Sequence, residues 1–215
     1  NPSIFALEET LAALEGAERA WAFCSGMAAE TALFLTHGRD GIICIGDAYG
    51  GTLELLTAQL PLLGIRTHLI LGSELHRLDD LLAGGAKLVF FETPTNPTLD
   101  LFDIRAIAAT AHARGARVAV DNTFASPVNQ RPLELGADVV MHSATKFLGG
   151  HSDLTAGALM GSKELLAPVW NWRKNLGSMI APETASLLSR SLRTLVVRVR
   201  QQNASAGTIA EAMQR

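Results

Sequence analysis

The sequence has few cysteines, few aromatic residues and no excess of either charge. Its 215 residues include two cysteines, one tyrosine and three tryptophans, and 21 acidic against 18 basic residues give a net charge of -3. This balance provides no basic face for nucleic acid or an anionic membrane, so we expect neither as a partner and expect a small-molecule substrate. Cys24 and Cys44 lie in apolar runs without the spacing of metal ligands, so we expect both to be buried.

The chain also has no long apolar run. No stretch approaches 18 consecutive apolar residues, and the opening Asn1-Pro2-Ser3 has neither the charge nor the apolar core of a signal peptide, so we expect a cytoplasmic protein. With 48% hydrophobic and 18% charged residues, the chain is suited to one large folded domain. It begins without Met and reaches Arg215 without a helix stop signal, which predicts a piece of a longer protein.

Short apolar runs alternate with amphipathic segments, a pattern typical of α/β domains in which helices cover a mainly parallel sheet. The expected strands are residues 19–23, 41–45, 65–71, 87–91, 117–120, 138–141 and 156–160. The expected helices are residues 26–36, 52–63, 74–82, 104–113 and 164–173. Leu188, Leu192, Leu195 and Val199 recur at helical spacing, which predicts one long helix over residues 181–215.

Two apolar runs are followed by groups that suit one cofactor. Asp121 ends the first run, and Ser143, Thr145 and Lys146 follow the second. A lysine in a dry pocket can form an imine, and hydroxyls with backbone N–H groups can bind a phosphate. A carboxylate can keep a pyridine nitrogen protonated, and these are together the groups that pyridoxal phosphate needs. Taken alone, such a short motif would more often mark a surface cation at Lys146 and a strand cap at Asp121, and the wider context reverses that preference.

Three further segments suit such a ligand. Ser25, Gly26 and Met27 open a helix whose first N–H groups could bind an anion, although Ser25 could also be an ordinary helix cap. Tyr49 precedes two glycines, and its ring could lie on a flat cofactor or belong to the pocket rim. Asn96 lies in a proline-containing loop directly after a strand, where ligands bind in open parallel sheets.

Four segments, in order, resemble the Cys/Met-metabolism (transsulfuration) family of pyridoxal-phosphate enzymes. They are residues 47–52, 92–97, 120–124 and 142–153. That family includes cystathionine γ-synthases, cystathionine lyases, methionine γ-lyases and acylhomoserine sulfhydrylases. The resemblance implies that residues 1–215 form a fold-type-I, aspartate-aminotransferase-like large domain that is incomplete at its N-terminus and lacks the C-terminal small domain.

The resemblance also implies roles for individual residues. Lys146 is the Schiff-base lysine, Asp121 pairs with the pyridinium, and Tyr49 stacks on the ring and assists proton transfer. The other implied cofactor contacts are Ser25, Gly26, Met27, Asn96, Thr123, Ser143 and Thr145. No metal site is expected, because His142, His151 and Asp153 do not have a usual ligand spacing.

The family completes its sites with residues that this chain lacks. A Tyr and an Arg come from the adjoining subunit, upstream of the position of Asn1, and the substrate-binding Arg belongs to the C-terminal domain. The resemblance therefore implies a homo-oligomer, a dimer of dimers with shared active sites, and weak cofactor binding by the chain as given.

The expected reaction is γ-replacement on an O-acylated homoserine to form cystathionine or homocysteine. Cystathionine γ- or β-lyase activity is the alternative, and methionine γ-lyase is less favoured because those enzymes usually carry a cysteine where this chain has Gly51. A non-catalytic relative is a hypothesis of another class. Loss of Lys146 or Asp121 would have supported it, and both are present.

Overall fold

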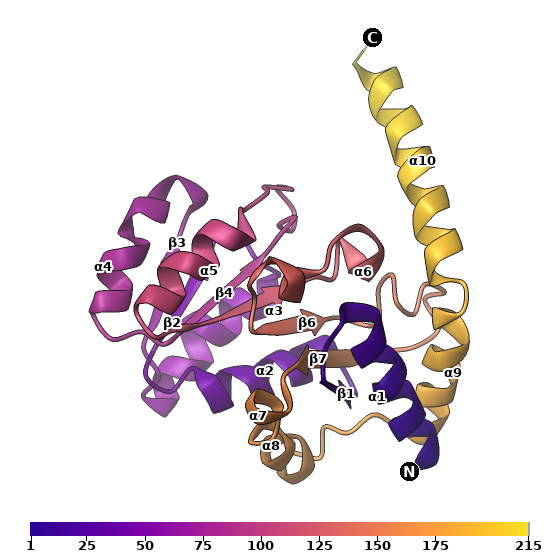
Figure 1. The fold of residues 1–215 in the computed structure, drawn as a ribbon, viewed down its shortest axis with the longest axis horizontal. Helices are drawn as coiled ribbons and strands as arrows, with labels where there is room; N and C mark the ends of the chain where they lie inside the picture. Colours follow the sequence, from indigo (N-terminus) through magenta and orange to yellow (C-terminus); the bar gives the residue numbers. More distant parts are fainter. Residues whose placement is uncertain (215) are drawn as a thin grey trace.

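A seven-stranded sheet in the order β1-β7-β6-β5-β4-β2-β3 forms the centre of the computed structural model, which describes residues 1–214 (Figure 1). Its strands are β1 (Arg19–Phe23), β2 (Ile42–Ile45), β3 (Thr67–Ile70), β4 (Leu88–Glu92), β5 (Arg117–Asp121), β6 (Val139–His142) and β7 (Gly157–Gly161). Strand β7 runs antiparallel to both of its neighbours, and the other pairs are parallel. The predicted mainly parallel α/β fold is confirmed, and every expected strand is present.

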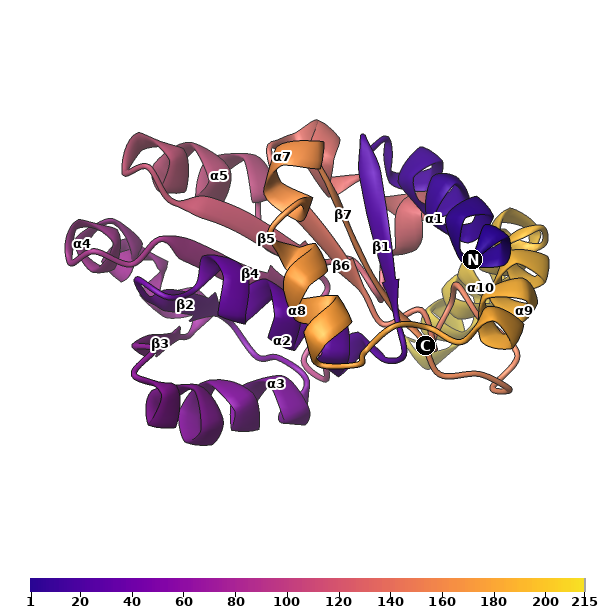
Figure 2. The ribbon, with the colours of Figure 1, turned by 90° about the horizontal axis from the view of Figure 1, so that it is seen from below.

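Helices cover both faces of this sheet (Figure 2). They are α1 (Pro2–Glu15), α2 (Gly26–His37), α3 (Gly50–Glu54), α4 (Leu78–Ala83), α5 (Ile104–Ala113), α6 (Ser126–Asn129), α7 (Lys163–Leu166), α8 (Val169–Asn175), α9 (Pro182–Leu192) and α10 (Leu195–Met213). Helices α2, α7 and α8 share one hydrophobic core with one face. On the other face, α4 and α5 cover the β2 side and α1 and α9 cover the β1 side.

Alternation along each strand produces these layers. In β4, Leu88 and Phe90 belong to the core under α2, whereas Val89 and Phe91 belong to the core under α4 and α5. Successive side chains of a strand point to opposite faces, so a strand that is covered twice is apolar at every position. This is why the apolar runs located the strands in the sequence.

The helical regions differ more from the expectation. Helix α1 was not predicted; Asn1 caps it, Pro2 begins it, and Ile4, Leu7 and Leu11 are buried. Pro168 separates α7 from α8 because proline cannot donate the backbone hydrogen bond that a continuous helix requires. The region expected as a helix over 52–63 begins with α3 and continues as a π-helical stretch over Leu55–Gln59 and a 3₁₀ turn over Leu60–Leu63.

The single helix expected over 181–215 is wrong, because the chain breaks between α9 and α10. The carbonyl oxygen of Ser191 accepts from the hydroxyl of Thr194 at 3.1 Å and from Arg198 Nη2 at 3.1 Å. The backbone N–H of Thr194 also donates to this oxygen, at 3.2 Å. Side chains that insert into the i→i−4 ladder redirect a helix, so α10 leaves the body of the domain at an angle to α9 (Figure 1).

Only one of the two cysteines is buried as expected. Cys44 lies in the interior of β2, whereas Cys24 is exposed because it follows β1 where the chain leaves the sheet. Within residues 1–214, no helix combines the length and the hydropathy that a bilayer-spanning segment requires.

Candidate active site

The sheet topology brings the polar strand ends to one edge. Strands β4 and β5 are parallel, and their register places Glu92 beside Asp121 at the ends of both strands. Strand β6 pairs with β5, ends one residue beyond the position opposite Asp121, and leads into Ser143. Strand β1 runs antiparallel to β7, and therefore parallel to β6, so Ser25 reaches the same edge.

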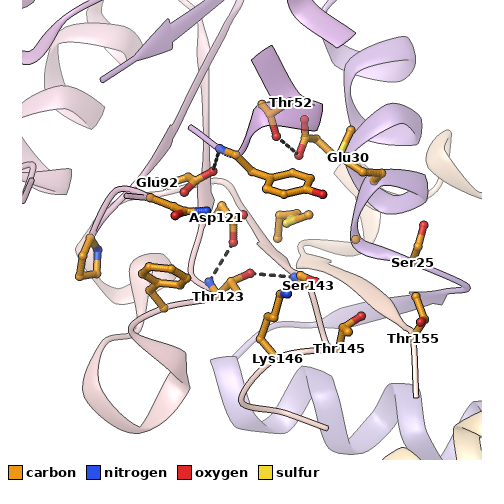
Figure 3. A pocket seen from close by; sticks show the side chains of 17 residues that line it. Ser25, Glu30, Thr52, Glu92, Asp121, Thr123, Ser143, Thr145, Lys146 and Thr155 are labelled. Atoms are coloured by element: carbon orange, nitrogen blue, oxygen red, sulfur yellow. Dashed lines mark hydrogen bonds between the residues drawn. The ribbon is translucent and has the colours of Figure 1, made fainter. Parts of the chain in front are cut away.

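A cavity of about 260 Å³ lies at this edge (Figure 3). All ten residues predicted from the sequence as catalytic or cofactor-binding line it, namely Ser25, Gly26, Met27, Tyr49, Asn96, Asp121, Thr123, Ser143, Thr145 and Lys146. Seven other residues complete the lining: Glu30, Thr52, Glu92, Pro94, Phe124, Met141 and Thr155. The structure therefore joins the whole predicted set in one place, while the role of each member stays a prediction.

The start of α2 forms one wall of the cavity. The side chain of Ser25 accepts from the N–H of Ala28 at 3.1 Å and so caps the helix, which is the alternative that the sequence left open for this residue. The first-turn N–H groups, including those of Gly26 and Met27, have no intrahelical acceptor and can bind an anion. A methyl group at Gly26 would lie 2.9 Å from the Cβ of Ser143, so glycine lets the helix start pack directly on the lysine-bearing segment.

Thr123 links the two sides of the site. Its N–H donates to Asp121 Oδ1 at 2.8 Å, and its hydroxyl oxygen accepts from the N–H of Ser143 at 2.8 Å. The first bond fixes the direction of a buried carboxylate, and the second fixes the strand exit before Lys146. Thr123 thus orients two other predicted site residues.

The hydroxyl of Thr145 is engaged within the protein. It donates to the carbonyl oxygen of Ala156 at 3.2 Å and accepts from the Ala156 N–H at 3.1 Å. A hydroxyl has a single donor, so this arrangement leaves Thr145 only one lone pair to present to a ligand. These contacts hold the segment around Lys146 against Ala156, which directly precedes β7.

Three carboxyl groups, those of Glu30, Glu92 and Asp121, gather at one end of the cavity. The other end is formed by Ser143, Thr145 and Lys146 (Figure 3). Burial, and then repulsion from Asp121, raise the pKa of Glu92 to about 8. Burial and the same repulsion hold the pKa of Glu30 well above its usual range, and burial raises that of Asp121. Adjacent buried carboxyls cannot all ionise, so this end of the cavity retains protons or requires a cation.

Glu92 and Glu30 each secure a neighbouring segment. Glu92 Oε1 accepts from the N–H of Tyr49 at 2.7 Å, and Glu30 Oε2 accepts from the hydroxyl of Thr52 at 2.9 Å. The other oxygen of Glu30 is buried without a hydrogen-bond partner among the residues that the structure describes. Neither Glu92 nor Glu30 was predicted from the sequence as a site residue. For Glu92 the available signal was an acid at the end of an apolar strand, as at Asp121.

Tyr49 is half exposed at the cavity wall, at 53%. A side-chain carbon at position 51 would lie 2.8 Å from Tyr49 Cε1 and 3.2 Å from Met27 Sδ. Gly51 therefore sets where the tyrosine ring rests, and a cysteine there would displace it.

The donors of this cavity fit pyridoxal phosphate. The N–H groups at the start of α2 and the Ser143 hydroxyl suit a phosphate, whereas the acidic end suits a protonated pyridine nitrogen. Lys146 is exposed at the wall, so its amine is accessible. Among residues 1–214, no group of three or more His, Cys, Asp or Glu side chains is arranged to hold a metal ion.

Comparison with known proteins decides the family. A family model described as Cys/Met metabolism PLP-dependent enzyme matches residues 1–215. The chain belongs to this family. The predicted family and its cofactor, pyridoxal 5'-phosphate, are thereby confirmed.

Relatives within the family differ in the reaction that they are named for. The chain is 43% identical to a cystathionine beta-lyase of Lactococcus lactis subsp. cremoris, covering 100% of this chain and 57% of the relative. It is 41% identical to cystathionine gamma-synthase 1 of Nicotiana tabacum, covering 100% of this chain and 40% of the relative. A solved structure of cystathionine gamma-lyase from Lactobacillus plantarum, in complex with L-serine, matches with a TM-score of 0.87 and 38% identity, over 92% of this chain and 52% of that one. The chain thus spans about half of the lengths of these relatives.

Proposed function

We propose that the protein containing this chain is a pyridoxal-phosphate enzyme that cleaves the C–S bond of cystathionine by β-elimination. The observation that carries the proposal is the cavity in which Lys146, Tyr49 and Asp121 meet a helix start suited to phosphate. The 43% identity to a cystathionine beta-lyase over the whole chain supports this choice of reaction.

Each side chain has a defined task in this proposal. Pyridoxal phosphate, when bound, supplies an electron-poor ring that stabilises negative charge at the substrate carbon next to the amine. The Lys146 amine would hold the cofactor, and it would move protons to and from the substrate carbons. Such proton transfers contribute about 10² to 10⁴ in rate.

Asp121 and Tyr49 act around that lysine. The Asp121 carboxylate, directed by the Thr123 N–H at 2.8 Å, would hold a proton on the pyridine nitrogen. Tyr49 would cover the flat face of the cofactor ring, and its phenol would assist proton transfer at the cavity mouth. The Glu92 carboxyl accepts a 2.7 Å hydrogen bond from the Tyr49 N–H and so fixes the backbone that carries the tyrosine ring.

The γ-replacement favoured from the sequence stays as the second candidate. The specific support for it is the 41% identity to a cystathionine gamma-synthase, again over the whole chain. A homo-oligomer with shared active sites and a cytoplasmic location also stay predictions; light scattering of the purified protein tests the first.

Product analysis separates these reactions. The full-length protein is assayed with cystathionine, and β-cleavage releases homocysteine, pyruvate and ammonia, whereas γ-cleavage releases cysteine, 2-oxobutyrate and ammonia. A second assay supplies O-acetyl- or O-succinylhomoserine with cysteine and measures cystathionine formation. Lys146→Ala is the control and should abolish every product. A protein that binds the cofactor but yields no product in any assay would support the non-catalytic alternative.

A further inference from the structure

Arg198, near the start of α10, lies against the turn that follows Lys146. Its Nη1 donates to the carbonyl oxygen of Phe147 at 2.8 Å, and its Nη2 lies 3.4 Å from the carbonyl oxygen of Leu148. These carbonyls belong to the two residues directly after the lysine. One guanidinium therefore binds two backbone acceptors of the lysine-bearing turn.

The same guanidinium is fixed to the break between α9 and α10. Its Nη2 donates to the Ser191 carbonyl oxygen at 3.1 Å, and its Nε donates to the Thr194 hydroxyl at 3.0 Å. A planar guanidinium with several acceptors loses little freedom for each bond that it makes. Arg198 is therefore a rigid bridge between the helix junction and the turn.

Gly150 closes the turn against this side chain. Its φ is +73°, and a methyl group there would overlap the guanidinium of Arg198. The N–H of Gly150 donates to the Lys146 carbonyl oxygen at 2.7 Å, and the N–H of Gly149 donates to the Ala144 carbonyl oxygen at 2.8 Å. The backbone of Lys146 is thus held inside a compact turn whose outer face is covered by Arg198.

A second contact joins the same two segments. His151 Nδ1 lies 2.7 Å from the carbonyl oxygen of Gly149 and 3.3 Å from the hydroxyl of Ser191. Beside this junction, a hollow of about 560 Å³ is lined by Lys146 and Gly150 and also by Gln202 of α10. Helix α10 and the lysine therefore face a common space.

We propose that Arg198 is a positioning residue, which fixes the turn carrying Lys146 and couples the location of its amine to the orientation of α10. Arg198 is not among the residues that line the cofactor cavity, and it acts through the backbone of residues 146–150. The inference rests on the proposed function only for the catalytic role of Lys146. The clamp itself depends on the contacts alone.

The first test measures the clamp without activity. In the cofactor-loaded full-length protein, Arg198→Met should raise hydrogen exchange at the Gly149 and Gly150 amides by about tenfold, because the turn loses its outer hydrogen bonds. Arg200→Met is the matched control, since Arg200 is exposed on the same helix, and it should leave both amides unchanged. Unchanged exchange in Arg198→Met would overturn the proposal.

The second test separates positioning from stability. In the cofactor-loaded protein, Arg198→Met should lower kcat about tenfold or more while KM stays within about twofold, since a misplaced lysine slows proton transfer. Arg198→Lys should recover part of the loss because an ammonium still reaches one carbonyl. A lower melting temperature with unchanged kcat would show that Arg198 is merely structural and would overturn the positioning role. If the unmodified protein has no turnover, the exchange result still decides the clamp, and the failure belongs to the proposed function.

Discussion

Replacing Glu92 by glutamine should change how the stability of the protein depends on pH. Glu92 is buried at the end of β4 beside Asp121, and burial raises its pKa from 4.5 to about 8. In the unfolded chain this carboxyl ionises near 4.5, whereas in the folded protein it keeps its proton up to about 8. The folded state therefore binds more protons in this window, and stability falls as the pH rises through it.

The magnitude follows from the size of the shift. A pKa change from 4.5 to about 8, at about 1.4 kcal/mol per unit, corresponds to a loss on the order of 5 kcal/mol by the upper end of the window. A glutamine side chain at position 92 stays neutral at every pH, and its amide oxygen can still accept from the N–H of Tyr49. Glu92→Gln should therefore match the unmodified protein near pH 5 and exceed its stability near pH 8.

Urea unfolding of the cofactor-free protein at pH 5, 6.5 and 8 measures this difference. Glu54→Gln is the matched control, because Glu54 is an exposed glutamate of the nearby α3, and its pH profile should follow the unmodified protein. Some slope will persist in Glu92→Gln, since the pKa values of Glu30 and Asp121 are also raised. Parallel profiles of Glu92→Gln and the unmodified protein would refute the assignment of the proton to Glu92.

Three other substitutions test the site and its support. Asp121→Asn should weaken cofactor binding roughly 10- to 100-fold, measured by fluorescence titration, because a charge-assisted hydrogen bond is worth about 1.5–3 kcal/mol. Gly26→Ala should destabilise the protein by about 1–3 kcal/mol in urea unfolding, since its methyl group would lie 2.9 Å from Ser143, whereas Gly50→Ala meets no described atom within 4 Å and should not. Glu15→Ala should cost about 3–5 kcal/mol, because it removes the buried partner of His142, and Glu15→Gln should cost less.

The sequence located the sheet and the cofactor site for the same reason. Strands covered on both faces are apolar throughout, so each run has a clear end, and the residue after that end is conspicuous when it is polar. Asp121 and Ser143 were found in this way. Because parallel strands end at one edge, residues that are far apart in the chain were expected together, and they line one cavity.

Helix α1 could not be found in this way, because its buried stripe contains acids. Glu8 and Glu15 are buried along with Leu7 and Leu11, which breaks the apolar pattern that predicts an amphipathic helix. Glu8 is accommodated because Arg173 Nη2 lies 2.8 Å from its Oε1. A partner so distant in the sequence leaves no local signal. The break after α9 has a similar origin, since Arg198 binds the carbonyl oxygens of residues 147 and 191.

The buried acids differ in their partners, and this difference distinguishes the acids that stabilise the fold from those that line the cavity. Glu8 faces the cation Arg173, and Glu15 Oε1 accepts from the amide of Asn122 at 2.9 Å and lies 2.6 Å from His142. Among residues 1–214, the side chain of Glu30 bonds only to the hydroxyl of Thr52, and the cavity that it lines also contains Glu92 and Asp121. Because these carboxyls either keep protons or require a cation, the acidic end of this cavity suits a ligand that brings positive charge. A protonated pyridine ring would supply that positive charge beside the carboxyl group that ionises.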